Sequence, residues 1–249
     1  LWKIVDRPNL LIKVPATIEG LPAITALIAD GISVNVTIIF SVERYKAVLE
    51  AFMAGLEQRL SHGKSITEIH SVASFFISRV DSEVDAQLKA LGTEAATALL
   101  GKTAIANARL AYQEFKTLKT TARWKILAEN GAHIQRPLWA STGVKDKSYD
   151  DTRYVTELTG PDTVNTMPQG TLDAVKDHGI ARGDALTPNF DSAIADLAAL
   201  AATGVSLQDV AIKLELEGIE EDDSRMKKVG NIRRVLELLK NSREQNFID

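Results

Sequence analysis

The chain has 249 residues, of which 45% are hydrophobic, so it can bury a large core in one big domain or two small ones. Its formal net charge of −4 gives no general attraction for nucleic acid or for an anionic membrane surface. It contains no cysteine, which excludes disulfides and thiolate metal sites and favours a reducing compartment. We therefore expect a cytoplasmic globular protein that binds neither nucleic acid nor membrane.

Short β-branched runs alternate with longer stretches of helical period along the chain. The candidate strands lie at residues 9–14, 33–40, 71–77, 137–141 and 163–167. The clearest helices are predicted at residues 21–29, 42–60, 105–118, 192–202 and 207–216. Residues 84–130 hold no strand signal, so they are interpreted as a helical insertion between the third and fourth strands. Strands that alternate with helices predict a parallel sheet.

Polar side chains follow the predicted strands at the points where they end. In parallel α/β folds, the carboxyl ends of the strands and the loops after them build the functional site. In chain order these ends present Lys13, Asn35 and Thr37, Ser74 and Arg79, Ser141 and Thr142, and Asn165 and Thr166. Polar groups that face a barrel interior are costly unless they line a ligand site. The set therefore predicts a polar pocket for an oxygen-rich substrate.

Lys13 stands inside the apolar, β-prone run "NLLIKVPAT". Lysine is rarely fully buried, but desolvation of its ammonium lowers its pKa toward the range of a useful nucleophile. Considered alone, the spacing favours a lysine that extends to solvent from a strand end.

Four long motifs occur in order along the chain: "LLIKVPATIEGLPAI", "GISVNVTIIFS", "SVASFFISRVDSEVD" and "RPLWASTGVKDKSY…GPDTVNTMP". Together they closely resemble transaldolase of the larger bacterial kind, from residue 1 to about residue 217. The resemblance implies a (β/α)8 TIM barrel that uses no cofactor. It also implies an enzyme of the pentose phosphate pathway, which transfers a dihydroxyacetone unit from sedoheptulose 7-phosphate to glyceraldehyde 3-phosphate through a lysine Schiff base.

By the same resemblance, Lys13 is the Schiff-base lysine, Asn35 holds a substrate oxygen and Thr37 positions the water used in proton transfer. Ser74 and Arg79 match the pair that binds the substrate phosphate, and a guanidinium fork suits that task. Smaller transaldolases carry a phosphate-binding arginine soon after the strand that ends near Ser141. Here the segment "STGVKDK" offers Lys145 or Lys147, and we take Ser141 and Lys145 as further substrate-binding candidates.

The chain departs from the family pattern in one important respect. Transaldolases of this kind carry three further strands before the position that corresponds to Leu1, and those strands supply an aspartate, an asparagine and a glutamate. None of the five strands found here ends in a carboxylate, so the obvious general acid/base is missing. We expect residues 1–217 to hold the last five strands of the barrel, with the others coming from a longer protein or another chain. Residues 218–249 are expected to form a charged helical tail.

Two other functions stay open. The chain could be another Schiff-base (class I) aldolase, or a non-catalytic barrel fragment that serves as an interaction module. The four histidines show no metal-ligand spacing, so we expect no metal site: His62, His70, His133 and His178. The expected partners are sugar phosphates, and the sequence leaves open whether the protein is a monomer or a homodimer.

Overall fold

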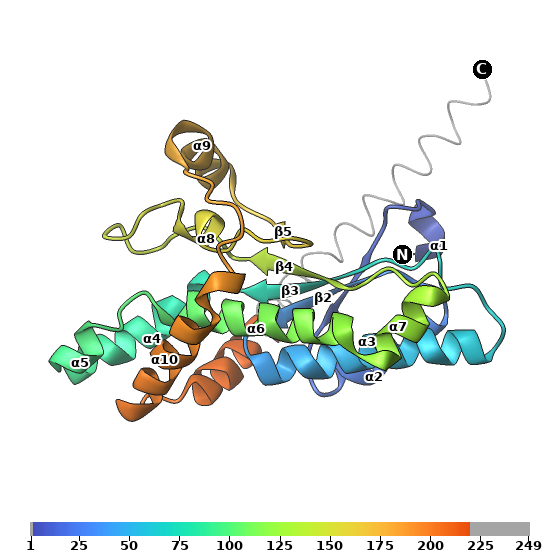
Figure 1. Cartoon of the computed structure of the whole chain (residues 1–249), viewed down its shortest axis with the longest axis horizontal. Coiled ribbons are helices and arrows are strands. Elements are labelled where there is room, and N and C mark those ends of the chain that lie inside the picture. The colour runs from blue at the N-terminus through green and yellow to red at the C-terminus, as the bar shows by residue number, and fades with distance from the viewer. Residues whose placement is uncertain (1, 220–249) are drawn as a thin grey trace, which may run out of the picture.

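Five parallel strands form one sheet in the computed structural model, which describes residues 2–219 (Figure 1). They lie side by side in chain order and are β1 (Ile12–Pro15), β2 (Val34–Ile39), β3 (Ser71–Phe76), β4 (Arg136–Ala140) and β5 (Val164–Asn165). Every neighbouring pair is parallel, and each strand falls within two or three residues of its predicted place. The parallel α/β prediction is therefore confirmed.

Helices fill the segments between these strands. The described residues contain α1 (Trp2–Val5), α2 (Gly20–Ala29), α3 (Val42–Ser61), α4 (Ser78–Leu91), α5 (Glu94–Thr97), α6 (Thr103–Thr120), α7 (Ala122–Glu129), α8 (Arg153–Thr156), α9 (Gln169–His178), α10 (Phe190–Ala202) and a last helix at residues 207–219. A 3-10 turn at Thr187–Asn189 precedes α10. The run from α4 to α7 is the predicted helical insertion, which confirms that β3 and β4 are joined by helices alone.

Local chemistry sets the ends of two of these helices. Ser41 precedes α3 in an extended conformation, and its hydroxyl accepts a hydrogen bond from Arg44 N (3.2 Å), which satisfies one free amide of the first turn. Gly92 ends α4 with φ of +63°, a left-handed conformation that a glycine adopts without steric cost. Ser41 is thus the N-cap of α3.

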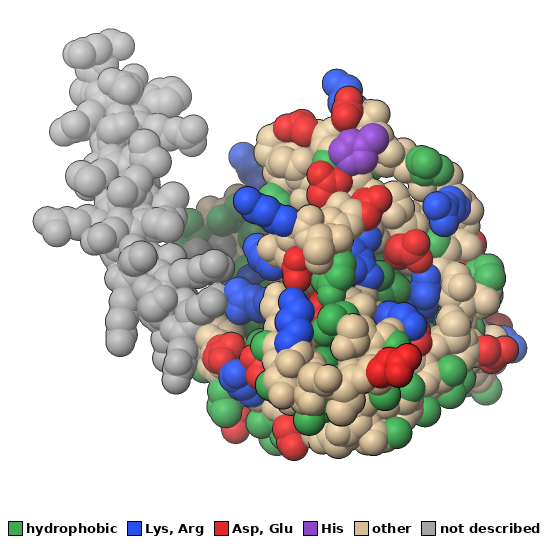
Figure 2. Space-filling model, turned by 90° about the vertical axis from the view of Figure 1, so that its left-hand side faces the viewer, with side chains coloured by type: hydrophobic (Ala, Val, Ile, Leu, Met, Phe, Trp, Pro, Cys, Tyr) green, Lys and Arg blue, Asp and Glu red, His purple; other side chains and the backbone are tan. Residues whose placement is uncertain are grey.

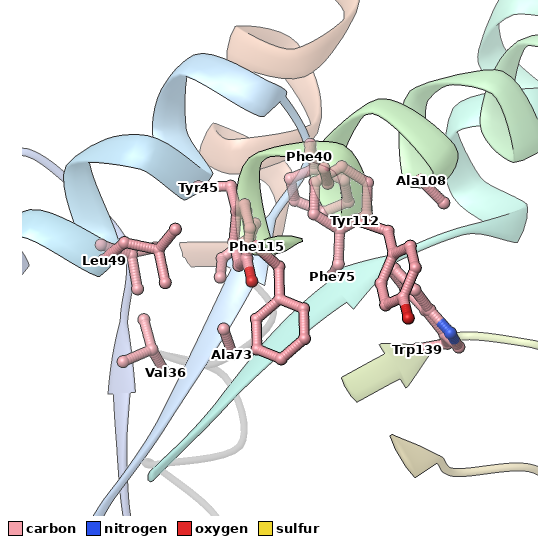
Figure 3. Packing of buried hydrophobic residues seen from close by; sticks show 14 of the residues in the cluster. Val36, Phe40, Tyr45, Leu49, Ala73, Phe75, Ala108, Tyr112, Phe115 and Trp139 are labelled. Carbon is pink, nitrogen blue, oxygen red and sulfur yellow. The ribbon is translucent and has the colours of Figure 1, made fainter. Parts of the chain in front are cut away.

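One face of the sheet packs against helices, and we call it the helix-covered face. Figure 1 shows α2, α3 and α6 along this side. Val36, Ala73 and Phe75 point toward α3 and α6, as Figure 3 shows, and all three are fully buried. The Phe75 ring meets the rings of Tyr45 (6.2 Å, 87°) and Trp139 (6.1 Å, 86°) edge to face. The apolar core of the described residues therefore lies between the sheet and these helices.

Side-chain alternation directs the residues in between to the opposite face, which we call the polar face. Lys13 is exposed there, Asn35 is half-buried and Ser74 is buried. In a closed barrel this face would be the interior. The parallel five-stranded sheet is consistent with such a barrel, and the assignment of these strands as the last five of eight stays a prediction.

The charged tail and the possibility of a membrane-spanning helix both concern the last part of the chain. Residues 220–249, which include most of the predicted charged tail, lie outside the described residues, so the division at residue 217 stays a prediction. Within residues 2–219, no single helix is long and apolar enough to cross a membrane. Only the pair 187–202 and 207–219, bent by 91°, meets that criterion when the two helices are taken together.

Candidate active site

Three of the predicted site residues lie on neighbouring strands of the polar face. Lys13 on β1 pairs in register with Asn35 on β2. Asn35 Oδ1 accepts a hydrogen bond from Ser74 Oγ on β3 at 2.7 Å. Because this bond uses the only hydroxyl proton of Ser74, that side chain must rotate before it can donate to a phosphate. The structure thus brings together an amine, an amide and a hydroxyl, in that order across the sheet.

The exposure of Lys13 matches a lysine that extends to solvent from a strand end rather than a desolvated one. A nucleophilic lysine was expected to be desolvated, but the side chain is exposed in the structure of residues 2–219. Alternation explains this result: Val14 takes the buried position at 7% exposure, and its neighbour must face the other way. The desolvation expected of a nucleophilic amine is therefore not supplied by the described residues.

Thr37 lies near the end of β2, opposite Pro15. Its side chain is 1% exposed, and its hydroxyl has no hydrogen-bond partner in the part of the chain that the structure describes. The pairing of β2 with β3 becomes irregular between Val36 and Ile39, where Ile38 adopts a φ of +55°. Left-handed backbone is an outlier for a β-branched residue, and such outliers concentrate at functional sites. A buried hydroxyl without a partner is a natural position for a bound water.

Arg79 lies in the first turn of α4, immediately after β3. Its guanidinium carbon lies 5.7 Å from the ring centroid of Phe76, the last residue of that strand, within the range of a cation–π contact. The prediction placed Arg79 beside Ser74 at the carboxyl end of the third strand, and the structure places it at that end.

Ser141 follows the last residue of β4, next to the carboxyl end of β3. It is half-buried, has a φ of +56°, and its hydroxyl lies 2.9 Å from the hydroxyl of Ser78, the first residue of α4. Thr142, which follows, donates from Oγ1 to Thr166 O (2.7 Å) and to Asn165 Oδ1 (3.1 Å). These contacts tie the ends of β3, β4 and β5 together and keep the predicted polar groups at one edge of the sheet.

Lys145 lies apart from this group. It is exposed on the loop after β4 and lines a cavity of about 470 Å³ between that loop and α4. Figure 2 shows the side of the molecule toward which β3 and β4 point in Figure 1, with Lys and Arg side chains around a recessed area. Asp146 lines the same cavity. Hydrogen bonds from Ser148 N–H and hydroxyl, and then from Lys89 (3.0 Å), lower the pKa of Asp146 to about 2.

Two buried carboxylates of α4 were not predicted as part of this region. Asp81 accepts hydrogen bonds from Tyr154 OH (2.6 Å) and Ala104 N (2.7 Å), and burial raises its pKa. Asp85 accepts from Tyr149 OH (2.7 Å) and Gly101 N (2.9 Å). Their oxygens thus hold the start of α6, the loop after β4 and α8 against α4, which is a structural task. In contrast, none of the five strands contains Asp or Glu.

Comparison with known proteins settles the family. The family model described as "Transaldolase/Fructose-6-phosphate aldolase" matches residues 1–231. The chain belongs to this family. Among curated proteins it is 61% identical over 221 residues to "Transaldolase" of Thermobifida fusca (strain YX), and 60% identical over 221 residues to "Transaldolase" of Arthrobacter sp. (strain FB24). It is also 56% identical over 237 residues to "Transaldolase" of Parafrankia sp. (strain EAN1pec).

Each alignment covers a larger share of this chain than of the relative. They include 89% of this chain and 60% of the Thermobifida and Arthrobacter proteins, and 95% of this chain and 64% of the Parafrankia protein. The chain therefore spans about 60% of the length of these transaldolase-family relatives. The resemblance seen in the sequence motifs is confirmed, whereas the number of strands outside the chain stays a prediction.

Proposed function

We propose that this chain carries the Schiff-base part of a transaldolase. The enzyme would transfer a dihydroxyacetone unit from sedoheptulose 7-phosphate to glyceraldehyde 3-phosphate. The observation that carries the proposal is the register of the polar face, where Lys13 pairs with Asn35 and Asn35 is bonded to Ser74. Membership of the transaldolase/fructose-6-phosphate aldolase family supports it.

In the proposed reaction, the neutral amine of Lys13 attacks the ketone carbon of the donor sugar, and loss of water gives an iminium ion. The iminium withdraws electrons, so that the bond between the α and β carbons can break once a base takes the proton of the β-hydroxyl. The rest of the sugar then leaves as an aldehyde, and the three-carbon unit stays on the lysine as an enamine. Asn35 would donate its amide hydrogens to a hydroxyl oxygen of that unit. The unpartnered hydroxyl of Thr37 would hold the water that carries protons at this centre.

We assign the phosphate end of the substrate to the carboxyl ends of β3 and β4. Arg79 would supply a rigid fork of donors there, with Ser74 and Ser141 adding hydroxyls. Lys145 would add a second cation from the loop after β4, because its ammonium is exposed on the same side of the molecule. These assignments extend the site from the reacting carbon to the charged end of the sugar.

The proposal needs a base for the substrate hydroxyl when the carbon–carbon bond breaks. The five described strands contain no carboxylate. The two buried carboxylates of α4, Asp81 and Asp85, already accept hydrogen bonds from Tyr154 and Tyr149. We therefore propose that the general acid/base comes from outside the described residues. The proposal includes a cytoplasmic location, favoured by the lack of cysteine. A monomer and a homodimer both fit it.

A second candidate is an aldolase that cleaves a sugar phosphate through the same Schiff base without transferring the three-carbon unit. The family description, which includes fructose-6-phosphate aldolase, favours keeping it. The two reactions differ in the fate of the lysine adduct. A transaldolase passes the unit to an aldehyde, whereas an aldolase releases free dihydroxyacetone in the absence of any aldehyde acceptor.

Borohydride trapping tests the proposal in the intact protein. We expect fructose 6-phosphate with borohydride to fix a dihydroxyacetone adduct on Lys13, located by peptide mass spectrometry, because reduction makes the imine permanent. Lys13→Arg keeps the positive charge but has no amine of suitable pKa, so it should show no adduct. Lys102, an exposed lysine far along the chain at the start of α6, serves as the internal control for nonspecific labelling. An adduct on Lys102 or Lys145, with Lys13 unmodified, would overturn the assignment.

A further inference from the structure

The pairing between β3 and β4 continues beyond the last residue of each strand. Ile77 N donates to Ala140 O (3.0 Å), and Ser78 N donates to Ser141 O (3.0 Å). The hydroxyls of Ser78 and Ser141 then meet at 2.9 Å. Ser78 is 1% exposed, so this contact is shielded from water. The start of α4 is thus fixed to the loop after β4 by two backbone bonds and one side-chain bond.

The hydroxyl of Ser78 is not used to cap its helix. Ile77 occupies the N-cap position of α4, and no side chain caps that end. A serine at a helix start commonly bonds the backbone amides of its own first turn. Here the hydroxyl instead reaches a residue 63 positions away in the sequence. Its role is therefore to join two segments rather than to stabilise one helix.

Ser141 is held in a conformation that non-glycine residues rarely adopt, with φ of +56°. Such backbone persists only where the surroundings hold it in place. The bonds from Ser78 lie on one side of this turn. The bonds of Thr142 to Thr166 O (2.7 Å) and Asn165 Oδ1 (3.1 Å) lie on the other. The turn therefore directs two consecutive hydroxyls to different neighbours.

The two segments that this contact joins carry two of the groups that we assign to the substrate phosphate, Arg79 and Ser141. Arg79 follows Ser78 directly, and either hydroxyl of the Ser78–Ser141 pair can be the donor. We propose that Ser78 is a positioning residue that donates to Ser141 Oγ, so that the Ser141 hydroxyl can donate in turn to the phosphate that Arg79 binds. This inference rests on the proposed function, because it assumes a phosphorylated substrate at this edge of the sheet.

Kinetics of Ser78→Ala in the intact protein test the proposal. We expect the KM for fructose 6-phosphate and the dissociation constant for inorganic phosphate to rise about tenfold, the effect of one lost hydrogen bond in a charged site. The kcat should stay within about twofold, because the contact lies away from the reacting carbon. Ser78→Thr, which restores the hydroxyl, should recover most of the phosphate affinity. A fall in kcat with unchanged phosphate affinity would overturn the proposal.

Ser71→Ala is the matched control. Ser71 is likewise a buried serine, at 3% exposure and at the start of β3, and its hydroxyl donates to Val34 O on the neighbouring strand (2.7 Å). It lies at the amino end of the sheet, so its loss should lower stability without changing phosphate affinity. An equal loss of phosphate affinity in Ser71→Ala would show that Ser78→Ala acts by general destabilisation.

The double variant Ser78→Ala/Ser141→Ala addresses the coupling between the two hydroxyls. If Ser78 acts only through Ser141, adding Ser78→Ala to Ser141→Ala should weaken phosphate binding no further. Additive losses would overturn the proposal.

Direct measurement of phosphate binding separates this inference from the proposed function. A wild-type protein that binds phosphate but forms no lysine adduct refutes the function alone, whereas one that binds no phosphate refutes the inference.

Discussion

The two faces of the sheet are built from alternate residues of the same strands, and they differ in kind. On β3, Ala73 and Phe75 are fully buried against helices, and the Phe75 ring meets two other aromatic rings. Ser74, between them, turns to the polar face and bonds Asn35. The helix-covered face holds the fold by apolar burial. The polar face instead carries groups that can react or donate hydrogen bonds.

In a parallel sheet, the residues that stabilise the fold and the residues that carry the chemistry are therefore neighbours along each strand. A shift of one residue along a strand would exchange the two faces. The apolar contacts on one face therefore fix the register that brings Lys13 opposite Asn35 on the other. It follows that substitutions on the helix-covered face should change the free energy of unfolding, whereas substitutions on the polar face should change binding or turnover.

Phe75→Ala should produce the largest change on the helix-covered face. The side chain is fully buried, and its removal leaves a cavity beside Tyr45 and Trp139, so we expect a loss of about 3–5 kcal/mol in the free energy of unfolding. Urea unfolding of the intact protein measures it. Lys13→Arg, an exposed change on the opposite face, should alter that free energy by less than about 0.5 kcal/mol. Similar losses in both variants would remove the distinction between the faces.

Arg79→Ala should have an intermediate effect, on binding. Loss of one charge-assisted contact to an anion costs about 1.5–3 kcal/mol, so the KM for a phosphorylated donor should rise by roughly ten- to a hundredfold. A donor without phosphate should be affected much less. Arg136→Ala is the control, because Arg136 is exposed at the amino end of β4, where its guanidinium donates to Asp162 O and Thr163 O. Equal impairment of both donors in Arg79→Ala would show that Arg79 is structural.

Local sequence signals were sufficient for the regular part of the fold. All five strands and helices α2 and α3 lie where β-branched runs and apolar spacing predict them. Helix α9 was not predicted, and of its ten residues only Thr171 is buried. A helix that contributes so little to the core leaves a weak apolar pattern in the sequence.

The details of the site depend on contacts between distant residues, which no local pattern reveals. The bond of Ser78 to Ser141 spans 63 positions, and that of Asp81 to Tyr154 spans 73. The left-handed turn at Ser141 gave no signal either, because serine is not a residue that favours positive φ. Family resemblance named the site residues, but only the three-dimensional register shows that Lys13, Asn35 and Ser74 adjoin one another.

Substitution of Thr37 should have the smallest effect, and it tests whether Thr37 belongs to the polar face or to the helix-covered face. Its hydroxyl is buried and has no partner among residues 2–219, whereas the hydroxyl of Thr142, at 0% exposure, donates to Thr166 O. Replacement of threonine by valine keeps the shape of the side chain and removes the hydroxyl. A partnered buried hydroxyl stabilises the fold, but an unpartnered one costs desolvation.

We therefore expect Thr37→Val to leave the free energy of unfolding unchanged or to raise it by up to about 1 kcal/mol, while it slows turnover by removing the hydroxyl that we propose holds a water. Thr142→Val should lower the free energy of unfolding by about 1 kcal/mol, because Thr166 O loses its donor. Urea unfolding and single-turnover kinetics measure the two effects separately. If Thr37→Val destabilised the protein as much as Thr142→Val and left turnover intact, Thr37 would belong to the structural side of the sheet, and the polar face would end at Asn35.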